Sequence, residues 1–173
     1  MAGIARGDRA ALGRLIALHG AAVERYAAQV LHRPHEAPDV AQEVFLRVWH
    51  HAARYDPARG AVSTWIWRIA LRLCLDANRK AGLRRFLGLE AAPEPLDESP
   101  QPEAALAARQ RLRQTRAAMA SLPERQRQAL LLRVVAEQST AEIAQTLGIG
   151  PGAAEQLLVR ARAALRRQLD PEG

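Results

Sequence analysis

Hydrophobic residues recur at steps of three and four along most of the first 80 positions, the spacing of amphipathic helices. Asp8 can cap a first helix, which ends near Arg33-Pro34 because a proline ring stops it. A second helix is expected from Asp39 to Arg54, with an apolar stripe on one side and polar residues on the other. The pattern therefore predicts helix throughout this half.

Ser63 or Thr64 can cap a third helix from Trp65 to about Arg79. Its core face is predicted to hold Trp65, Ile66, Ile69, Ala70, Leu73 and Ala77, which leaves a basic strip of Trp67, Arg68, Arg72, Asn78, Arg79 and Lys80. Cations beside an indole suit a single-stranded nucleic acid, because the cations neutralise phosphates and a base stacks on the ring. The alternative is that both tryptophans are core residues and the arginines only solvate a face.

The C-terminal half predicts a helix from Leu106 to Met119, a second from Glu124 to Val135, and then a helix-turn-helix. Ser139 or Thr140 caps the first helix of that motif, Gly148 supplies its turn and Pro151 starts its second helix. The interior face of the second helix is Ala154, Leu158, Ala161 and Leu165. Such a motif places the front of its second helix in a DNA major groove, although a helical hairpin for protein contacts is the alternative.

Charge divides the chain into two basic units joined by an acidic segment. The 25 Lys and Arg against 18 Asp and Glu give a net charge of +7. Residues 1–86 carry 14 basic and 7 acidic side chains, residues 87–108 carry none and 5, and residues 109–173 carry 11 and 6. Four prolines and the carboxylates predict an extended, mobile linker at 87–105 between domains at 1–86 and 106–173. We therefore expect an all-α protein in which neither half leans rigidly on the other.

The sequence gives little support for an enzyme, a metal-binding protein or a membrane protein. The only cysteine, Cys74, lies in an apolar run, which predicts a buried thiol and no disulfide. No metal-ligand spacing, Gly-rich phosphate loop, signal peptide or membrane span is recognisable. The sequence predicts a cytoplasmic protein without catalytic residues, cofactor, metal or small-molecule substrate.

Five motifs together resemble the extracytoplasmic-function (group IV) sigma factors of bacterial RNA polymerase. In order, they are Asp39-Val-Ala-Gln-Glu-Val-Phe-Leu-Arg-Val-Trp49, Tyr55-Asp-Pro-Ala-Arg-Gly60, Ser63-Thr-Trp-Ile-Trp-Arg-Ile-Ala70, Leu122-Pro-Glu-Arg-Gln-Arg-Gln-Ala-Leu-Leu-Leu-Arg133 and the helix-turn-helix from Thr140 to Ala154. A lone helix-turn-helix is a weak signal, but five motifs in register across nearly the whole chain are a strong one.

The resemblance implies binding of core RNA polymerase through the β′ clamp helices and the β flap. It assigns the clamp-helix contact to Asp39, Gln42, Glu43, Leu46 and Arg47. It also implies opening of the minus-ten promoter element, with a flipped base held in a loop pocket. The residues implied for minus-ten DNA are Arg59, Ser63, Thr64, Trp67, Arg68, Arg72, Asn78, Arg79 and Lys80, where Arg72 stands in place of the family's frequent asparagine.

The helix-turn-helix is implied to read the minus-thirty-five element. The residues expected there are Thr140, Gly152, Ala153, Glu155, Gln156, Arg160, Arg162 and Arg166. Related proteins commonly carry a lysine where this chain has Glu155, so weak or unusual recognition is expected, with Gln156 as the main base reader. Leu157 and Val159, expected to be exposed, could instead contact a protein partner such as an anti-sigma factor, which the family usually has.

A second hypothesis remains open. The chain could be a polymerase-independent helix-turn-helix regulator whose N-terminal helices sense a signal or dimerise. Co-purification with core polymerase separates the two hypotheses, because a free-standing regulator protects a palindromic site by itself.

Overall fold

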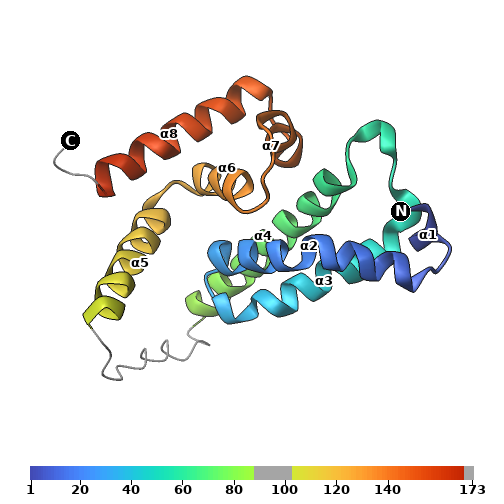
Figure 1. Cartoon of the computed structure of the whole chain (residues 1–173), viewed down its shortest axis with the longest axis horizontal. Coiled ribbons are helices and arrows are strands. Elements are labelled where there is room, and N and C mark those ends of the chain that lie inside the picture. The colour runs from blue at the N-terminus through green and yellow to red at the C-terminus, as the bar shows by residue number, and fades with distance from the viewer. Residues whose placement is uncertain (88–102, 170–173) are drawn as a thin grey trace.

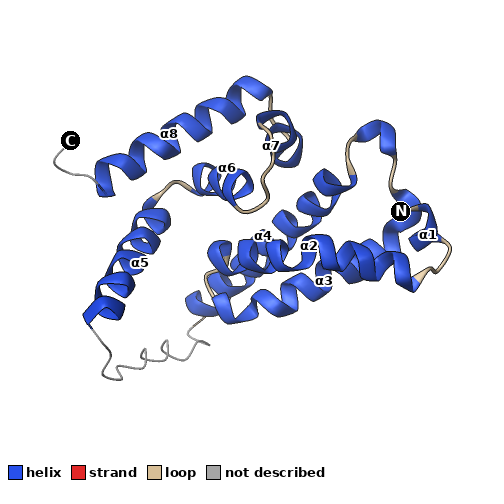
Figure 2. Ribbon diagram, in the orientation of Figure 1, coloured by secondary structure: helices blue, strands red, loops and turns tan. Residues whose placement is uncertain are grey.

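The computed structural model describes residues 1–87 and 103–169, and every regular element in these ranges is a helix (Figures 1 and 2). The all-α prediction is confirmed. Most of the acidic segment, residues 88–102, lies outside the described residues, so its expected extension stays a prediction.

The N-terminal half contains four α-helices and three short 3₁₀ turns within its described residues. They are α1 (Ala2–Ala5), α2 (Arg9–Val30), η1 (Pro34–Glu36), α3 (Ala37–His51), η2 (Ala52–Arg54), η3 (Pro57–Arg59) and α4 (Val62–Phe86). Asp8 caps α2 as expected, since its carboxylate accepts a hydrogen bond from the Ala11 N–H. Helix α1 was not expected from the sequence.

Three helix starts differ from the prediction, and one of them is that of the helix expected from Leu106, which begins at Glu103. Helix α3 begins two residues before Asp39. Pro38 fits its first turn, because the N–H group that proline lacks would have no partner within the helix there. Helix α4 begins after Ala61, and neither Ser63 nor Thr64 caps it. It continues to Phe86, with two arginines in its last turn, where cations favour the helix dipole.

The C-terminal half consists of α5 (Glu103–Ser121), α6 (Glu124–Val134), α7 (Thr140–Leu147) and α8 (Pro151–Leu169). Ser139 and Glu142 form a reciprocal capping box on α7, and hydrogen bonds from Ser139 lower the pKa of the Glu142 carboxyl. Gly148 takes the left-handed conformation, with φ of +66°, at the turn into α8. The predicted helix-turn-helix is therefore formed.

The two halves share one hydrophobic core, so the expectation that neither leans on the other is wrong for this structure. Helix α7 packs against α4, and α6 packs against α2 (Figure 1). Buried residues from both halves form one cluster, including Val23, Tyr26 and Trp67 from the first and Leu132 and Ile143 from the second. The sequence pattern did not predict this contact, because the apolar spacing of a helix shows that one face is buried but not which element covers it.

Candidate nucleic-acid and protein interfaces

A basic cleft opens between the η2–η3 loop and the first half of α4. Its volume is about 450 Å³. The lining side chains are mostly cationic or aromatic, and they comprise Arg47, His51, Arg54, Tyr55, Asp56, Arg59, Thr64, Trp65, Arg68, Ile69 and Arg72. With five arginines against one carboxylate, the cleft attracts an anionic ligand.

The loop beside the cleft is held in shape by its own residues. The Tyr55 hydroxyl donates to the Gly60 carbonyl at 3.0 Å, and the Asp56 carboxylate accepts from the Ala58 N–H at 2.9 Å. Gly60 has φ of +134°, which side-chain-bearing residues rarely adopt. The rings of Tyr55 and Trp65 lie 5.8 Å apart and give the cleft an aromatic wall.

Four of the residues predicted to bind minus-ten DNA line this cleft: Arg59, Thr64, Arg68 and Arg72. Thr64 is 2% exposed, and its hydroxyl oxygen has no hydrogen-bond partner among the described residues. A buried polar atom without a partner costs free energy, so a ligand that reached this hydroxyl would gain from binding it. Ser63 is half-buried and does not line the cleft.

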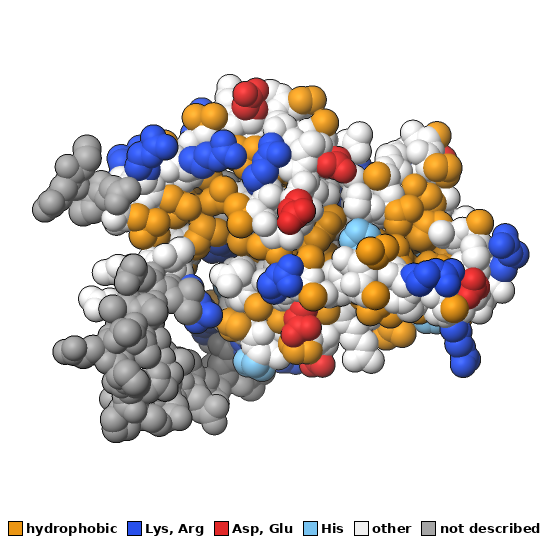
Figure 3. Space-filling model, in the orientation of Figure 1, with side chains coloured by type: hydrophobic (Ala, Val, Ile, Leu, Met, Phe, Trp, Pro, Cys, Tyr) orange, Lys and Arg blue, Asp and Glu red, His pale blue; other side chains and the backbone are white. Residues whose placement is uncertain are grey.

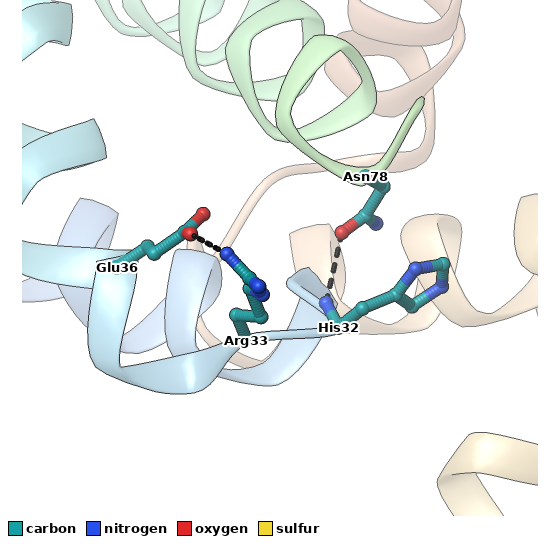
Figure 4. Close-up of polar contacts among 4 residues, drawn as sticks. All are labelled: His32, Arg33, Glu36 and Asn78. Atoms are coloured by element: carbon teal, nitrogen blue, oxygen red, sulfur yellow. Dashed lines mark hydrogen bonds and ion pairs between the residues drawn. The ribbon is translucent and has the colours of Figure 1, made fainter. Parts of the chain in front are cut away.

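Trp67 and Asn78 do not lie on the exposed strip, and that part of the prediction is wrong. Trp67 is 2% exposed and meets Tyr26 edge to face, with ring centroids 5.4 Å apart. The buried Asn78 amide donates to the Val30 carbonyl at 2.9 Å, and its oxygen accepts from the His32 N–H at 2.8 Å (Figure 4 draws the second bond). Asn78 therefore fastens the end of α2 to α4.

The tryptophan at the cleft is Trp65, which the sequence had placed in the core. Trp65 and Trp67 are two positions apart, so they point to different sides of α4, and helical periodicity alone could not decide between them. The neighbouring Tyr55-to-Gly60 motif was the available signal, because Tyr55 is the ring that Trp65 meets.

Arg79 and Lys80 are exposed at the other end of α4. They line a separate groove between α3 and α4, which also contains Asp39, Glu43 and Arg47. Arg79 pairs with Asp76, and the Arg47 Nε donates to Glu43 at 2.8 Å. The structure therefore divides the predicted minus-ten residues between two places.

A third surface is an apolar groove of about 890 Å³ between α2 and α3. Gln42 and Leu46, both predicted to bind polymerase, line it, while Asp39, Glu43 and Arg47 do not. Helix α2 supplies the opposite wall with Leu12, Ile16, Ala17 and Gly20. Ile16 is 41% exposed along this groove. An exposed apolar groove with polar edges is typical of a protein-binding surface.

The exposed face of α8 carries almost all of the residues predicted for the minus-thirty-five element. Ala154, Leu158 and Ala161 are buried as predicted, and Gly152, Ala153, Glu155, Gln156, Arg160, Arg162 and Arg166 are exposed. Figure 3 shows basic side chains in a row along α8. Thr140 is half-buried and accepts a hydrogen bond from Arg133 at 2.7 Å.

Val159 is exposed as expected, but Leu157 is half-buried and packs against the shared core. The expectation of an exposed Leu157 was therefore wrong. Across residues 1–87 and 103–169, no helix is long and apolar enough to cross a membrane. The same residues hold no group of three or more His, Cys, Asp or Glu that could bind a metal ion.

Comparison with known proteins covers both halves. Residues 15–84 match the family described as Sigma-70 region 2, and residues 112–165 match Sigma-70, region 4. The RNA polymerase sigma factor CnrH of Cupriavidus metallidurans is 32% identical, over 97% of this chain and 91% of the relative. The extracytoplasmic-function sigma factor SigW of Bacillus subtilis is 28% identical, over 96% and 92%.

The solved structure of CnrH in complex with the cytosolic domain of CnrY superposes with a TM-score of 0.75 at 27% identity. The superposition covers 99% of this chain and 96% of that one. The arrangement of both halves, and not each half alone, therefore has a counterpart in a solved structure.

The hydrogen bonds of Asn78 make a prediction about stability. Asn78→Ala leaves the Val30 carbonyl and the His32 N–H without their partner, so it should lower the free energy of unfolding by about 2 kcal/mol. Urea denaturation followed by circular dichroism measures this change. Lys80→Ala, an exposed neighbour, is the control and should cost less than about 0.5 kcal/mol. If Asn78→Ala were as stable as wild type, the two hydrogen bonds of Asn78 would not stabilise the fold.

Proposed function

Because the chain belongs to the sigma-70 family, as a sigma factor of the extracytoplasmic-function type, we propose that three of its surfaces divide the tasks of transcription initiation. The apolar groove binds core RNA polymerase, the basic cleft opens the minus-ten element, and α8 reads the minus-thirty-five element. The boundaries 1–86 and 106–173 separate the first two tasks from the third. The protein acts in the cytoplasm as an initiation factor without chemistry of its own.

Polymerase binding is assigned to the groove between α2 and α3. Leu46 is 44% exposed beside the exposed Gln42, and Ile16 faces the same groove from α2. An amphipathic helix, such as a β′ clamp helix, fits a groove with an apolar floor and a few polar groups at its edge. The polymerase-binding surface continues around α3 into the neighbouring groove between α3 and α4. That groove contains Asp39, Glu43 and Arg47, together with Arg79 and Lys80.

Promoter opening is assigned to the basic cleft. An unpaired base of the non-template strand would stack on the Trp65 and Tyr55 wall, while Arg59, Arg68 and Arg72 neutralise the flanking phosphates. The unpartnered Thr64 hydroxyl offers a hydrogen bond to the base edge. Arg79 and Lys80, at the far end of α4, would contact the adjoining backbone.

The exposed face of α8 is assigned to the minus-thirty-five element. Arg160, Arg162 and Arg166 supply phosphate contacts, and Gln156 is the side chain best suited to a base edge. Glu155 repels the phosphates that pass it, so recognition should be weak. The β flap is the expected polymerase contact of this half.

A protein partner that restrains the sigma factor is also expected. The relative CnrH has been solved with the cytosolic domain of CnrY bound. We expect an anti-sigma factor to bind this chain, with the apolar groove and the exposed Val159 as candidate contacts.

The observation that supports this assignment best is the presence of an apolar groove and a basic cleft on different sides of one three-helix unit. Co-purification with core polymerase, followed by run-off transcription, tests it. The chain should bring down β′ and direct specific transcripts. A chain that binds no core polymerase and protects a palindromic site alone would be a regulator instead.

Leu46→Asp should weaken binding to core polymerase at least about tenfold, because it places a charge in the centre of an apolar contact. Competition against a labelled sigma factor for core enzyme measures the affinity. Leu18→Asp is the matched control, since Leu18 is 75% exposed on α2 and does not line the groove. Equal affinities for the two variants would remove Leu46 from the interface.

Arg59→Ala combined with Arg72→Ala should leave core binding intact but reduce open-complex formation. The salt dependence should lose about one counterion for each lost phosphate contact. Permanganate reactivity of the minus-ten thymines at several salt concentrations measures both effects. The control removes the same charge at exposed positions outside the cleft, Arg25→Ala with Arg116→Ala. If the salt dependence of open-complex formation were unchanged, Arg59 and Arg72 would not contact phosphates.

Glu155→Lys should tighten promoter binding by the holoenzyme and steepen its salt dependence, because it converts a repulsion into a phosphate contact. Glu155→Gln removes only the repulsion and should give a smaller gain. Electrophoretic mobility shifts over a salt series measure the promoter affinities of the wild type and the two variants. The absence of any gain in either variant would show that α8 already docks productively.

A further inference from the structure

The basic cleft contains more positive charge than its own residues neutralise. Arg54, Arg59 and Arg72 line the cleft, are exposed, and make no side-chain ion pair or hydrogen bond within residues 1–87 and 103–169. Asp56, the one carboxylate in the described lining, accepts a hydrogen bond from the Ala58 N–H instead. Guanidinium groups bind phosphate oxygens through paired hydrogen bonds. Three of them in one cleft therefore favour a ligand that carries several phosphates close together.

The other two arginines of the cleft already have partners. The Arg47 Nε donates to Glu43 at 2.8 Å. Arg68 donates two hydrogen bonds to the Gln145 carbonyl of α7, from Nε at 2.9 Å and from Nη2 at 2.7 Å. Both side chains add positive potential to the cleft, but phosphate binding falls mainly to the three unpaired arginines.

The same lining also suits a nucleobase. Tyr55 and Trp65 are half-buried, and their rings lie 5.8 Å apart at an angle of 58°, so a flat base can stack against this wall. Thr64 lines the cleft, and its buried hydroxyl has no hydrogen-bond partner among the described residues. The polar edge of a base would supply one. The volume of about 450 Å³ is that of a small-molecule site.

We propose that the basic cleft binds a free nucleoside diphosphate or triphosphate. The base lies against Tyr55 and Trp65, with its edge at the Thr64 hydroxyl, and the phosphates lie at the three unpaired arginines. A single strand separates its phosphates by sugars, whereas a free nucleotide places two or three phosphates beside one base. Because minus-ten DNA is assigned to the same groups, the nucleotide would compete with the promoter strand. That consequence, unlike the binding itself, rests on the proposed function.

GDP is the probe for the binding step, in buffer without magnesium so that its phosphates are free. Isothermal titration of the full chain should give one GDP per chain. The affinity should be several-fold higher than for guanosine, which lacks the phosphates, and for pyrophosphate, which lacks the base. The absence of GDP binding, or equal affinities for GDP and pyrophosphate, would overturn the proposal, because a basic protein attracts any polyanion.

Two double variants separate the cleft from the overall charge. Arg59→Ala with Arg72→Ala should lower the GDP affinity about tenfold or more, since two phosphate contacts are lost. Arg25→Ala with Arg116→Ala removes the same charge at exposed positions outside the cleft and should change the affinity little. Equal losses in the two double variants would show attraction by net charge alone and would overturn the site.

Thr64→Val tests the position of the base with little change of shape. The Thr64 hydroxyl has no partner to lose in the free chain, so the thermal unfolding midpoint should not fall. The GDP affinity should nevertheless fall several-fold, while the pyrophosphate affinity stays the same. An unchanged GDP affinity would contradict the proposed position of the base.

Competition with a fluorescent single-stranded minus-ten oligonucleotide distinguishes this proposal from the proposed function. GDP should displace the oligonucleotide from the full chain. If GDP binds as expected and the oligonucleotide binds elsewhere or not at all, the nucleotide site stands and the assignment of the cleft to DNA is contradicted. If the oligonucleotide binds through Arg59 and Arg72 but GDP does not bind, the nucleotide proposal is overturned and the DNA assignment stands.

Discussion

Helix α4 is the element on which the rest of this structure depends, because its buried residues are too numerous for one partner. Ile66, Trp67, Ala70, Leu73 and Cys74 belong to a core that α2, α3 and α7 all help to enclose. Its exposed arginines lie beside these buried positions along the same helix. Any element that covers the apolar face of α4 therefore also lies close to the arginines of α4. In this structure, α7 covers part of that face.

The two candidate surfaces of the N-terminal half are consequently in different states. The apolar groove between α2 and α3 is open, with Ile16 and Leu46 exposed along it. At the basic cleft, Arg68 of α4 donates two hydrogen bonds to the Gln145 carbonyl of α7. The second half of the chain thus covers α4 near Arg68 and leaves the groove between α2 and α3 uncovered.

The sequence predicted the helices and the helix-turn-helix well, because capping residues, prolines and apolar spacing are local signals. Asp8, Ser139 and Gly148 all act at the helix ends where they were expected. It predicted less of the site, since the direction of a side chain near a helix boundary depends on its partners. Trp65 and Trp67 exchanged roles, and Asn78 is held by backbone groups of residues 30 and 32, far away in sequence. The contact between the halves was missed because periodicity shows that a face is buried but not against what.

The most direct test of this account is a distance measurement within one chain in solution, because the shared core requires the two halves to lie together. Donor and acceptor dyes at Ala58→Cys and Ala163→Cys, both exposed positions, would report the separation of the η3 loop from α8, while the buried Cys74 stays unlabelled. The account predicts high transfer efficiency in the folded chain and a large fall when urea unfolds it. An efficiency in the folded chain that is as low as in urea would contradict it.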